Sequence, residues 1–597
     1  MNTERVGGSA FSEDERSIFF HSNRSGIFNV YSIPLSGGES RPWTRSTKES
    51  TYVLAAFPND SRFLYTYDKG GDENSHIYLR ELDGSERDLT PGEKTKANFL
   101  RWSRDDKSFF FSTNERDPKF FDVYEMNIGN GERALIYRDT QGFQFRDISN
   151  DRRFLAFKKP GSSTADSDVY LYRSSTKEMK NITPHQGDVG NDPQTFDVNS
   201  KYLYILSNDG AEFMYVARYD LNSGKREIVE KAPWDVSIFN FSRNGKYRVV
   251  AVNEAARTKI KISEEATGKA VALPPLPEGD INGVNISNSE TKIAFYHEGA
   301  RSPANLYVYD FATNKATRLT NSLNPEINPE DLVESRVVRY KSFDGLEIPA
   351  ILYTPYGAGS DHKVPAIVKV HGGPGGQARV NYSASTQYFV NHGYAVLDVN
   401  NRGSGGYGRT FFMADDQKHG REPLWDCVEA KKYLAQTGHV DTKKIGILGG
   451  SYGGYMVLAA LAFKPEEFAV GVDIFGVSNW VRTLQSIPPY WESERKSLYT
   501  EIGDPTKQLD MLREISPLFH ADKITKPLIV LQGQNDPRVI KPESDEMVAA
   551  IKKKGGVVQY VVFDDEGHGF TKKANEIRAY RAILDFLDKF LKGTPQS

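Results

Sequence analysis

The sequence predicts a multidomain protein in which an N-terminal β-propeller precedes an α/β domain built on a mostly parallel sheet. Three observations support this prediction. The chain has 597 residues, more than a single hydrophobic core usually organises. Its first half repeats with a period near 45 residues. Its second half alternates apolar strand-like runs with helical stretches.

The repeat of the first half is a polar turn that leads into a β-rich strand. Its seven copies are FSEDERSIFF from 11, FPNDSRFLYT from 57, WSRDDKSFFF from 102, ISNDRRFLAF from 148, VNSKYLYILS from 198, FSRNGKYRVV from 241 and ISNSETKIAF from 286. Each unit has room for about four short strands, which is the size of a propeller blade. We therefore expect a seven-bladed β-propeller over residues 1–325. A β-sandwich with evenly spaced turns is the lesser alternative.

The second half begins after a segment rich in Asn, Pro and acidic residues. We predict that residues 326–340 are a linker and that residues 341–597 form the α/β domain. Continuous apolar runs such as PAIVKV and KKIGIL alternate with helical stretches, as in a parallel sheet covered on both faces. Ligands of such sheets bind beyond the C-terminal ends of the strands, so functional residues are expected there.

Composition excludes several classes of function. A formal net charge of −3 gives no electrostatic footprint for nucleic acid. The single cysteine, Cys427, excludes an internal disulfide framework and a cysteine-based zinc site. The turn YDLNSGK (219–225) starts like a calcium loop but lacks its downstream glutamate. We therefore expect neither a metal nor another cofactor.

No membrane association is expected either. The longest apolar stretch, MVLAALAF, is far shorter than a membrane-spanning helix, and the N-terminus has no apolar core of a signal peptide. We expect a cytoplasmic protein, or a periplasmic or secreted one if a leader was removed. The oligomeric state does not follow from the sequence.

The segment KIGILGGSYGGYM (444–456) places four glycines around Ser451. It fits the pattern G-x-S-x-G between a strand and a buried helix, which is the setting of the nucleophile elbow of α/β-hydrolases. In that sharp turn neighbouring segments approach too closely for side chains, and the hydroxyl is held clear of the sheet. We predict that Ser451 is a nucleophile, although ordinary loops also match this pattern by chance.

A serine nucleophile needs a base and a carboxylate that orients the base. In α/β-hydrolases the acid and then the histidine follow the serine at later strand ends. PLIVLQGQNDPRV supplies Asp536, and VVQYVVFDDEGHGF supplies His568, the last histidine of the chain. Three rival acids lie on the histidine's own loop, where we expect them to be solvated: Asp564, Asp565 and Glu566.

Two backbone N–H groups are candidate donors to an oxyanion. One belongs to Tyr452, directly after the serine. The other is assigned to Gly373 in HGGPGG (371–376), which follows a strand where such folds place the second donor, with His371 shaping the loop. A phosphate-binding loop is discounted because no Gly-Lys-Ser/Thr follows.

This set of motifs resembles the prolyl oligopeptidase family of serine peptidases over essentially the whole chain. SFDGLEIPA, HGGP, NNRGSGGYG, GGSYGGYM, NDPRV and DEGHGF stand in that family's order. The resemblance implies a triad of nucleophile Ser451, acid Asp536 and base His568. It also implies that Gly373 and Tyr452 occupy the oxyanion positions.

The resemblance sets expectations for substrate binding as well. It implies that Arg538 binds a backbone carbonyl of the substrate, with a surface ion pair as the alternative. HGGP is the form found in the acylaminoacyl and dipeptidyl branches. The family's dipeptidyl peptidases hold the substrate amine with paired glutamates from the propeller, and we match no segment to that pair. Independently, Tyr490 and Trp491 of PPYWES (488–493) are candidates for the specificity pocket, with core packing as the alternative.

The expected function is therefore hydrolysis of short peptides through an acyl-enzyme, by an exopeptidase or oligopeptidase of acylaminoacyl or dipeptidyl type. A carboxylic-ester hydrolase with the same triad is one alternative. A non-catalytic propeller scaffold that binds a partner is another. The side chain preferred at the cleaved bond and the recognised end of the peptide stay open.

Overall fold

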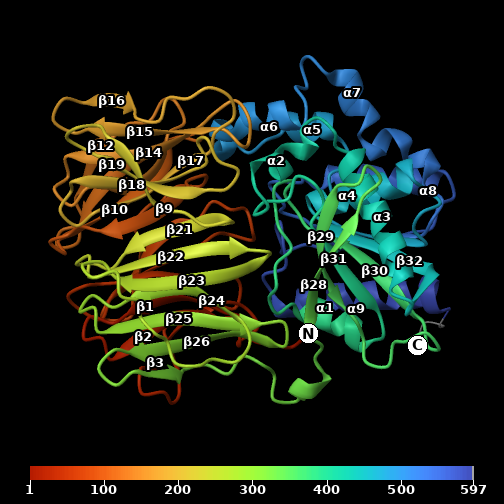
Figure 1. The fold of residues 1–597 in the computed structure, drawn as a ribbon, viewed down its shortest axis with the longest axis horizontal. Helices are drawn as coiled ribbons and strands as arrows, with labels where there is room; N and C mark the ends of the chain where they lie inside the picture. The colour runs from red at the N-terminus through yellow and green to blue at the C-terminus, as the bar shows by residue number, and fades with distance from the viewer. Residues whose placement is uncertain (594–597) are drawn as a thin grey trace.

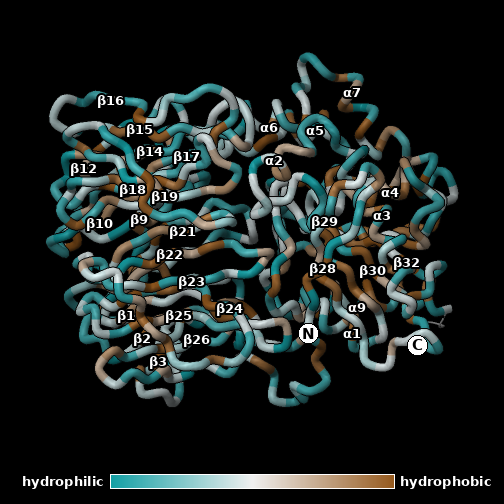
Figure 2. Tube along the Cα trace, viewed as in Figure 1, coloured by the Kyte–Doolittle hydropathy of each residue, from teal (hydrophilic) through white to brown (hydrophobic). Residues whose placement is uncertain are grey.

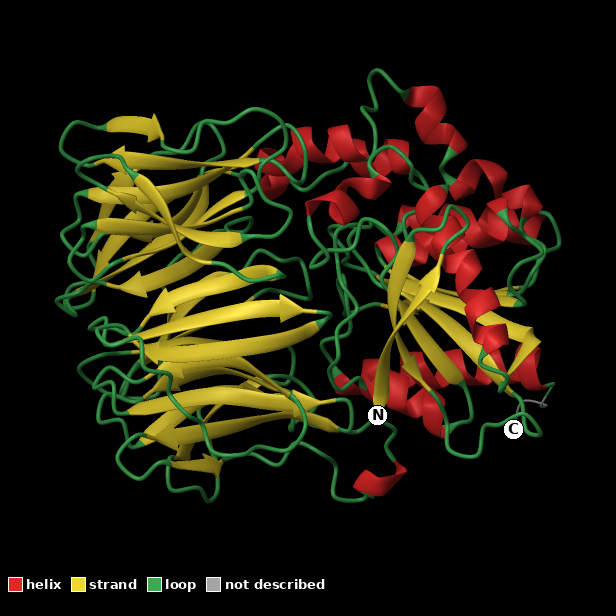
Figure 3. Ribbon diagram, viewed as in Figure 1, coloured by secondary structure: helices red, strands yellow, loops and turns green. Residues whose placement is uncertain are grey.

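The computed structural model describes residues 1–593. Two parts lie side by side (Figure 1): an all-β part formed by the first half of the chain and an α/β part formed by the second. Apart from one short turn of 3₁₀-helix, the helices belong to the second part (Figure 3). No helix among the described residues is long and apolar enough to cross a membrane.

The all-β part consists of seven antiparallel sheets in chain order, which confirms the seven blades of the predicted propeller. The strands of the first three sheets are β1 (Val6–Phe11), β2 (Ser17–Ser22), β3 (Asn29–Pro34), β4 (Arg41–Pro42), β5 (Tyr52–Ala56), β6 (Phe63–Tyr67), β7 (His76–Arg80), β8 (Glu86–Asp88), β9 (Ala97–Trp102), β10 (Ser108–Asp117), β11 (Phe120–Asn127) and β12 (Arg133–Tyr137). Those of the next four are β13 (Gln144–Ile148), β14 (Phe154–Pro160), β15 (Ser167–Arg173), β16 (Glu178–Asn181), β17 (Asn191–Phe196), β18 (Tyr202–Ser207), β19 (Tyr215–Asp220), β20 (Arg226–Glu230), β21 (Asp235–Phe241), β22 (Tyr247–Glu254), β23 (Arg257–Glu264), β24 (Asp280–Ile286), β25 (Lys292–Gly299), β26 (Ser302–Asp310) and β27 (Lys315–Arg318).

The sixth blade differs from the other six. It has three strands, β21 to β23, where each of the others has four. A single bridge between Ser263 and Ala270 stands in for the outer strand. The segment that follows contains Pro274, Pro275 and Pro277, which have no N–H to donate to a strand ladder. The proline content therefore explains why the fourth strand is missing here.

Apolar side chains fill the interfaces between the blades. Each pair of neighbouring blades shares its own buried cluster, such as Phe19, Phe63 and Tyr78 between the first two. The ring is closed in the same way, because Ile18 and Phe20 of the first blade pack with Leu306 of the last. Figure 2 shows these hydrophobic residues along the strands and hydrophilic ones on many of the outer turns. Blades that are amphipathic sheets bury their faces only by stacking on one another.

The α/β part is built on one eight-stranded sheet with the order β28-β29-β31-β30-β32-β33-β34-β35. The pairs that involve β28 and β29 are antiparallel, and the remaining pairs are parallel. Its strands are β28 (Ser335–Lys341), β29 (Glu347–Tyr353), β30 (Val364–Val370), β31 (Ala395–Val399), β32 (Val440–Gly450), β33 (Val470–Ile474), β34 (Leu528–Gly533) and β35 (Val558–Phe563). The mostly parallel sheet predicted from the alternating pattern is confirmed.

Helices cover both faces of this sheet. One buried core contains residues of α3, α4 and α8, and the other contains residues of α1 and α9. The helices are α1 (Ala384–Asn391), α2 (Arg409–Phe412), α3 (Glu422–Gln436), α4 (Tyr452–Phe463), α5 (Trp480–Gln485), α6 (Arg495–Glu501), α7 (Leu509–Glu514), α8 (Pro542–Lys553) and α9 (Lys573–Leu587). Because two layers of helices cover it, the sheet exposes its functional residues only at strand ends.

One strand lies where the sequence predicts a linker. β28 falls almost wholly within residues 326–340, yet it pairs along its length with β29. Its residues therefore belong to the eight-stranded sheet. Apolar and polar residues alternate in SRVVRYK with the period of an edge strand that has one buried face. The neighbouring prolines and acidic residues made this segment resemble a linker.

Candidate active site

Ser451 lies at the sharp turn between β32 and α4. Its backbone adopts φ 58° and ψ −121°, a strained conformation for a residue with a side chain. A Cβ atom on Gly449 would lie 2.3 Å from the carbonyl oxygen of Gly453. A Cβ atom on Gly453 would lie 2.2 Å from that of Val370. The glycines are therefore required where strand, turn and helix approach one another, as the elbow motif predicts.

His568 bridges the serine and the aspartate. Its Nε2 lies 3.0 Å from Ser451 Oγ, and its Nδ1 lies 2.7 Å from Asp536 Oδ2. The backbone N–H groups of Arg538 and Val539 both donate to Asp536 Oδ1 at 2.9 Å, which orients the carboxylate. With its hydrogen on Nδ1, the imidazole presents a lone pair on Nε2 to the serine hydroxyl. Loops after β32, β34 and β35 thus bring the three side chains together.

The rival acids lie elsewhere. Asp564 and Asp565 are exposed, as expected. Glu566 is buried rather than solvated, which corrects the expectation from the sequence. Its carboxylate accepts from the N–H groups of Thr571 and Lys572, just ahead of α9. The sequence does not reveal this burial, because the N–H donors that compensate it come from the following turn.

The two predicted oxyanion donors lie beside the serine. Gly373 and Tyr452 line the same pocket as Ser451. Within residues 1–593, neither of their backbone N–H groups donates to another residue. The ring of His371 fixes the loop that carries Gly373. Its Nδ1 lies 2.7 Å from the carbonyl oxygen of Gly372, and its Nε2 lies 2.7 Å from Ser404 Oγ. Both N–H groups are thus available to a ligand.

An apolar pocket of about 190 Å³ adjoins Ser451. Its apolar lining includes Val477, Trp480, Leu484, Ile487, Trp491, Leu498 and Ile502. Tyr490 does not line it, in contrast to the prediction. Neighbouring residues of the 3₁₀ turn Pro489–Glu494 point in different directions, so Trp491 faces the pocket while the Tyr490 hydroxyl donates to Glu73 Oε2 at 3.1 Å.

The chain matches known proteins over nearly its whole length. The profile described as the prolyl oligopeptidase family matches residues 380–594, and that of its N-terminal β-propeller domain matches residues 42–322. The chain is 32% identical to dipeptidyl aminopeptidase BIII of Pseudoxanthomonas mexicana over 589 residues, which is 95% of this chain and 84% of that protein. The chain belongs to the prolyl oligopeptidase family.

Further similarities agree with this assignment. Dipeptidyl peptidase family member 6 of Caenorhabditis elegans is 29% identical over 96% of this chain and 83% of its own. The solved puromycin-hydrolyzing peptidase of Mycobacterium tuberculosis has the same fold, with a TM-score of 0.85, 20% identity and coverage of 100% of this chain and 96% of that one. As a member of the prolyl oligopeptidase family, the protein is a serine-type peptidase that acts on peptides.

The propeller of this prolyl oligopeptidase family member reaches the rim of the pocket through Glu73. This residue lies on the loop between β6 and β7 and has φ +63°. Its Oε1 accepts from Arg538 Nε at 2.6 Å. The Arg538 guanidinium also lies 5.3 Å from the ring centre of Trp491. The structure therefore places Arg538 in an ion pair, but one between the two parts of the chain and beside the pocket.

The same loop contacts the segments that carry Asp536 and His568. Asn535 Nδ2 donates to the carbonyl oxygen of Gly70 at 3.0 Å. A Cβ atom on Gly567 would lie 2.1 Å from the carbonyl oxygen of Gly71. The glycine before His568 is thus needed for the propeller loop to approach.

Electrostatics keeps Glu73 ionised. Burial by itself raises the pKa of this carboxyl. The hydrogen bond and charge of Arg538 outweigh that effect, with smaller contributions from Lys96 and Tyr490, and the pKa ends below its ordinary value. A negative charge is therefore held at the rim of the pocket at neutral pH.

Sequence reasoning missed Glu73. No segment of the sequence matches the family's pair of glutamates, and within residues 1–593 the structure instead brings Glu73 to Arg538. Its loop spans residues 68–75, but the equivalent loops of the first, fourth and fifth blades (23–28, 161–166 and 208–214) are nearly as long, so loop length does not single it out. Nothing local indicated that it would meet Arg538, which lies 465 positions further along the chain.

Proposed function

We propose that Ser451, His568 and Asp536 are the catalytic triad of an aminopeptidase of dipeptidyl type, which cleaves short fragments from free N-termini. The contact of Glu73 with Arg538 at the rim of the pocket is the observation that carries this proposal. A fixed carboxylate suits the ammonium of a free N-terminus and has no use for an acylated one. The named dipeptidyl peptidases among the relatives match 95% and 96% of the chain and agree with this choice.

The reaction follows from the contacts of the triad. Ser451 Oγ attacks the peptide carbonyl while His568 Nε2 takes its proton, and Asp536 stabilises the imidazolium that forms. The N–H groups of Tyr452 and Gly373 donate to the developing oxyanion. His568 then protonates the leaving amine, and water releases the acyl group by the same steps in reverse.

The substrate is oriented by three features around Ser451. An apolar side chain before the cleaved bond fills the pocket of about 190 Å³. The guanidinium of Arg538 donates to a backbone carbonyl of the substrate. Its Nε is engaged by Glu73, but its Nη groups donate to no residue within 1–593, so the ion pair can persist during binding. Glu73 accepts from the substrate ammonium.

Paired substrates test this proposal. A dipeptidyl amide with an apolar second residue is compared with its N-acetylated form, using wild type and Glu73→Gln. Losing a charge-assisted hydrogen bond lowers kcat/KM for the free amine by about 10- to 100-fold, mainly through KM. Turnover of the N-acetylated form, which is already slow, does not change further.

The control is Glu492→Gln, which removes a carboxylate that pairs with Lys119 across the same interface. It is expected to leave both substrates unaffected. An equal loss on free and acetylated substrates in Glu73→Gln would limit Glu73 to positioning Arg538 and would reject amine recognition. Preferred turnover of ester analogues by wild type would favour the carboxylic-ester hydrolase. The cytoplasmic location stays a prediction.

A further inference from the structure

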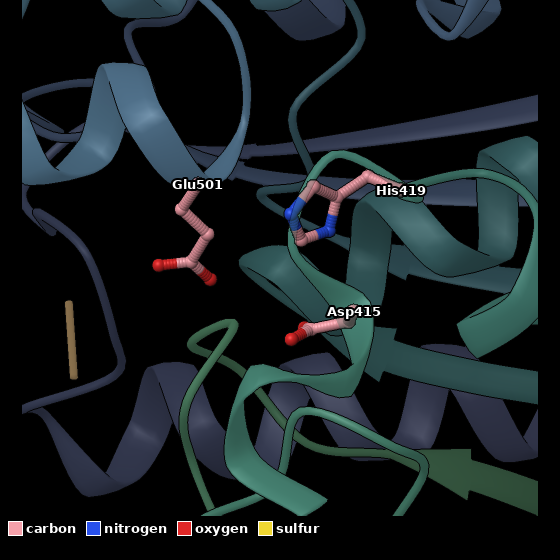
Figure 4. A group of neighbouring side chains, drawn as sticks. All are labelled: Asp415, His419 and Glu501. Atoms are coloured by element: carbon pink, nitrogen blue, oxygen red, sulfur yellow. The ribbon is translucent and has the colours of Figure 1, made fainter. Parts of the chain in front are cut away.

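A second group of ionisable side chains lies behind the pocket. Asp415 ends the turn η2 (Met413–Asp415), His419 follows it ahead of α3, and Glu501 ends α6. Figure 4 shows the two carboxylates and the imidazole converging on a common space. One ligand atom from each lies within 4.8 Å of the other two. None of the three belongs to the proposed triad.

These side chains are withdrawn from solvent. Asp415 is 1% exposed, His419 0% and Glu501 4%. A carboxylate loses its hydration at such a position and needs a compensating charge or hydrogen bonds. The ammonium of nearby Lys418 donates to the carbonyl oxygen of Ala414 instead.

Two atoms of the group lack partners. Asp415 Oδ2 and His419 Nε2 are buried and form no hydrogen bond with any residue in 1–593. The space for the carboxylate is shaped by Gly403, where a Cβ atom would lie 1.9 Å from Asp415 Oδ2. Buried polar atoms without partners are uncommon in native proteins and call for a ligand, an ion or a water molecule.

The other nitrogen of the imidazole is already oriented. His419 Nδ1 lies 2.7 Å from the hydroxyl oxygen of Tyr452. A hydrogen on Nδ1 donated to that oxygen leaves the Nε2 lone pair directed into the cluster. Histidines that bind metals are commonly held in this way, with the second ring nitrogen donating to a fixed acceptor.

We propose that Asp415, His419 and Glu501 bind one divalent transition-metal ion, for which Zn²⁺ is the probe. One imidazole nitrogen and two carboxylate oxygens suit Zn²⁺ or Mn²⁺, whereas Ca²⁺ and Mg²⁺ favour sites made entirely of oxygen. Ligand atoms around tetrahedral Zn²⁺ lie about 3.4 Å apart. The side chains therefore close inward by about 1 Å on binding, through rotation of the carboxylates. The single cysteine and the incomplete calcium loop do not exclude a site of this kind, which is built from one histidine and two carboxylates.

The position of the ion indicates a structural role. Leu498 on α6 and Ile502 directly after it line the specificity pocket, and Tyr452 carries a candidate oxyanion donor. The backbone N–H of Gln417 donates to the carbonyl oxygen of Glu501 at 2.7 Å, so the turn and α6 already touch. The ion would connect α6, which lines the pocket, to the turn η2. Through the contact of His419 with Tyr452 it would also connect α6 to the start of α4.

Metal binding by the full-length protein tests the proposal. Protein freed of metal by chelation and dialysis is titrated with Zn²⁺, Mn²⁺, Mg²⁺ and Ca²⁺, and bound metal is counted by elemental analysis. We expect one Zn²⁺ per chain and a higher thermal midpoint with Zn²⁺ than without. Co²⁺ in the same site gives visible absorption bands typical of low coordination number. Retention of Mg²⁺ or Ca²⁺ alone would refute the proposed class of ion.

Variants of similar shape localise the site. His419→Gln and Glu501→Gln each lower the affinity for Zn²⁺ by at least about 100-fold, since each removes one of three protein ligands. Asp416→Asn, a change in the neighbouring acid, is the matched control and retains binding. Circular dichroism and labelling by a fluorophosphonate report whether each variant is folded. If folded wild type binds no Zn²⁺, or binds it as tightly as both glutamine variants, the proposal is overturned and the two carboxyls share protons instead.

Discussion

The two parts of this chain achieve stability in different ways. The propeller repeats one small antiparallel sheet seven times, with an apolar cluster between each pair of neighbouring blades. The α/β part instead has one sheet with a core on each face. A substitution in one blade affects mainly the neighbouring blades, because each blade contacts only those. A substitution at a strand end of the single sheet affects the site directly. The propeller is therefore expected to tolerate substitutions better than the α/β part does.

The largest expected effect is on chemistry and is confined to the α/β part. Ser451→Ala should lower peptide turnover by about 10⁴-fold or more, because the proposed nucleophile is lost while the fold is kept. Turnover of a fluorogenic peptide measures the loss, and labelling by a fluorophosphonate should disappear with it. Activity within tenfold of wild type would assign the nucleophile to another residue.

A core change in the propeller should cost stability without altering the site. Phe20 is fully buried at the contact that closes the ring, so Phe20→Ala should lower the free energy of unfolding by about 3–5 kcal/mol. Molecules that remain folded should keep wild-type kcat. Urea unfolding followed by tryptophan fluorescence and turnover below the transition measure both. A large fall in kcat at full folding would show that packing at this blade interface controls the active site.

A small change at the elbow should affect both the stability and the site. Gly453→Ala puts a methyl group 2.2 Å from the carbonyl oxygen of Val370, so the turn must shift. We expect a loss of about 1–3 kcal/mol in stability and about 100-fold in kcat, because Ser451 is displaced from His568. Gly359→Ala is the control, since nothing lies within 4 Å of its added Cβ. Equal behaviour of the two variants would show that the elbow tolerates movement.

The smallest expected effect concerns the ion pair that joins the two parts. The pKa of Glu73 is lower in the folded protein than in the unfolded chain. The ion pair therefore stabilises the fold fully at pH values above the ordinary glutamate pKa. This stabilisation is lost as the pH falls through the lowered pKa. Arg538 is partly exposed, which limits the contribution to about 1 kcal/mol. The stability difference between wild type and Glu73→Gln should be constant from about pH 8 to 6 and vanish in acid. A difference that grows on acidification would have the wrong sign.

Much of the architecture was predictable because it depends on local patterns. The period near 45 residues predicts the blades, since a blade is a unit of consecutive strands. The order of Ser451, Asp536 and His568 at strand ends predicts their meeting, because parallel strands present these ends at one edge of the sheet. β28 escaped prediction because neighbouring proline and acidic residues obscured a short strand pattern, whereas the sixth blade has three strands because its prolines cannot donate to a fourth.

The sequence by itself determined the seven-bladed cover, the hydrolase sheet and the candidate nucleophile, acid and base. Only the tertiary structure decided that Glu73 reaches Arg538, that Trp491 rather than Tyr490 lines the pocket, and that Asp415 and His419 meet Glu501. The features determined by the sequence depend on the period of the strands and on the order of motifs along the chain, and both can be read from consecutive residues. The features decided by the tertiary structure depend on how separately folded surfaces pack, and that packing brings together residues whose neighbours in sequence carry no sign of it.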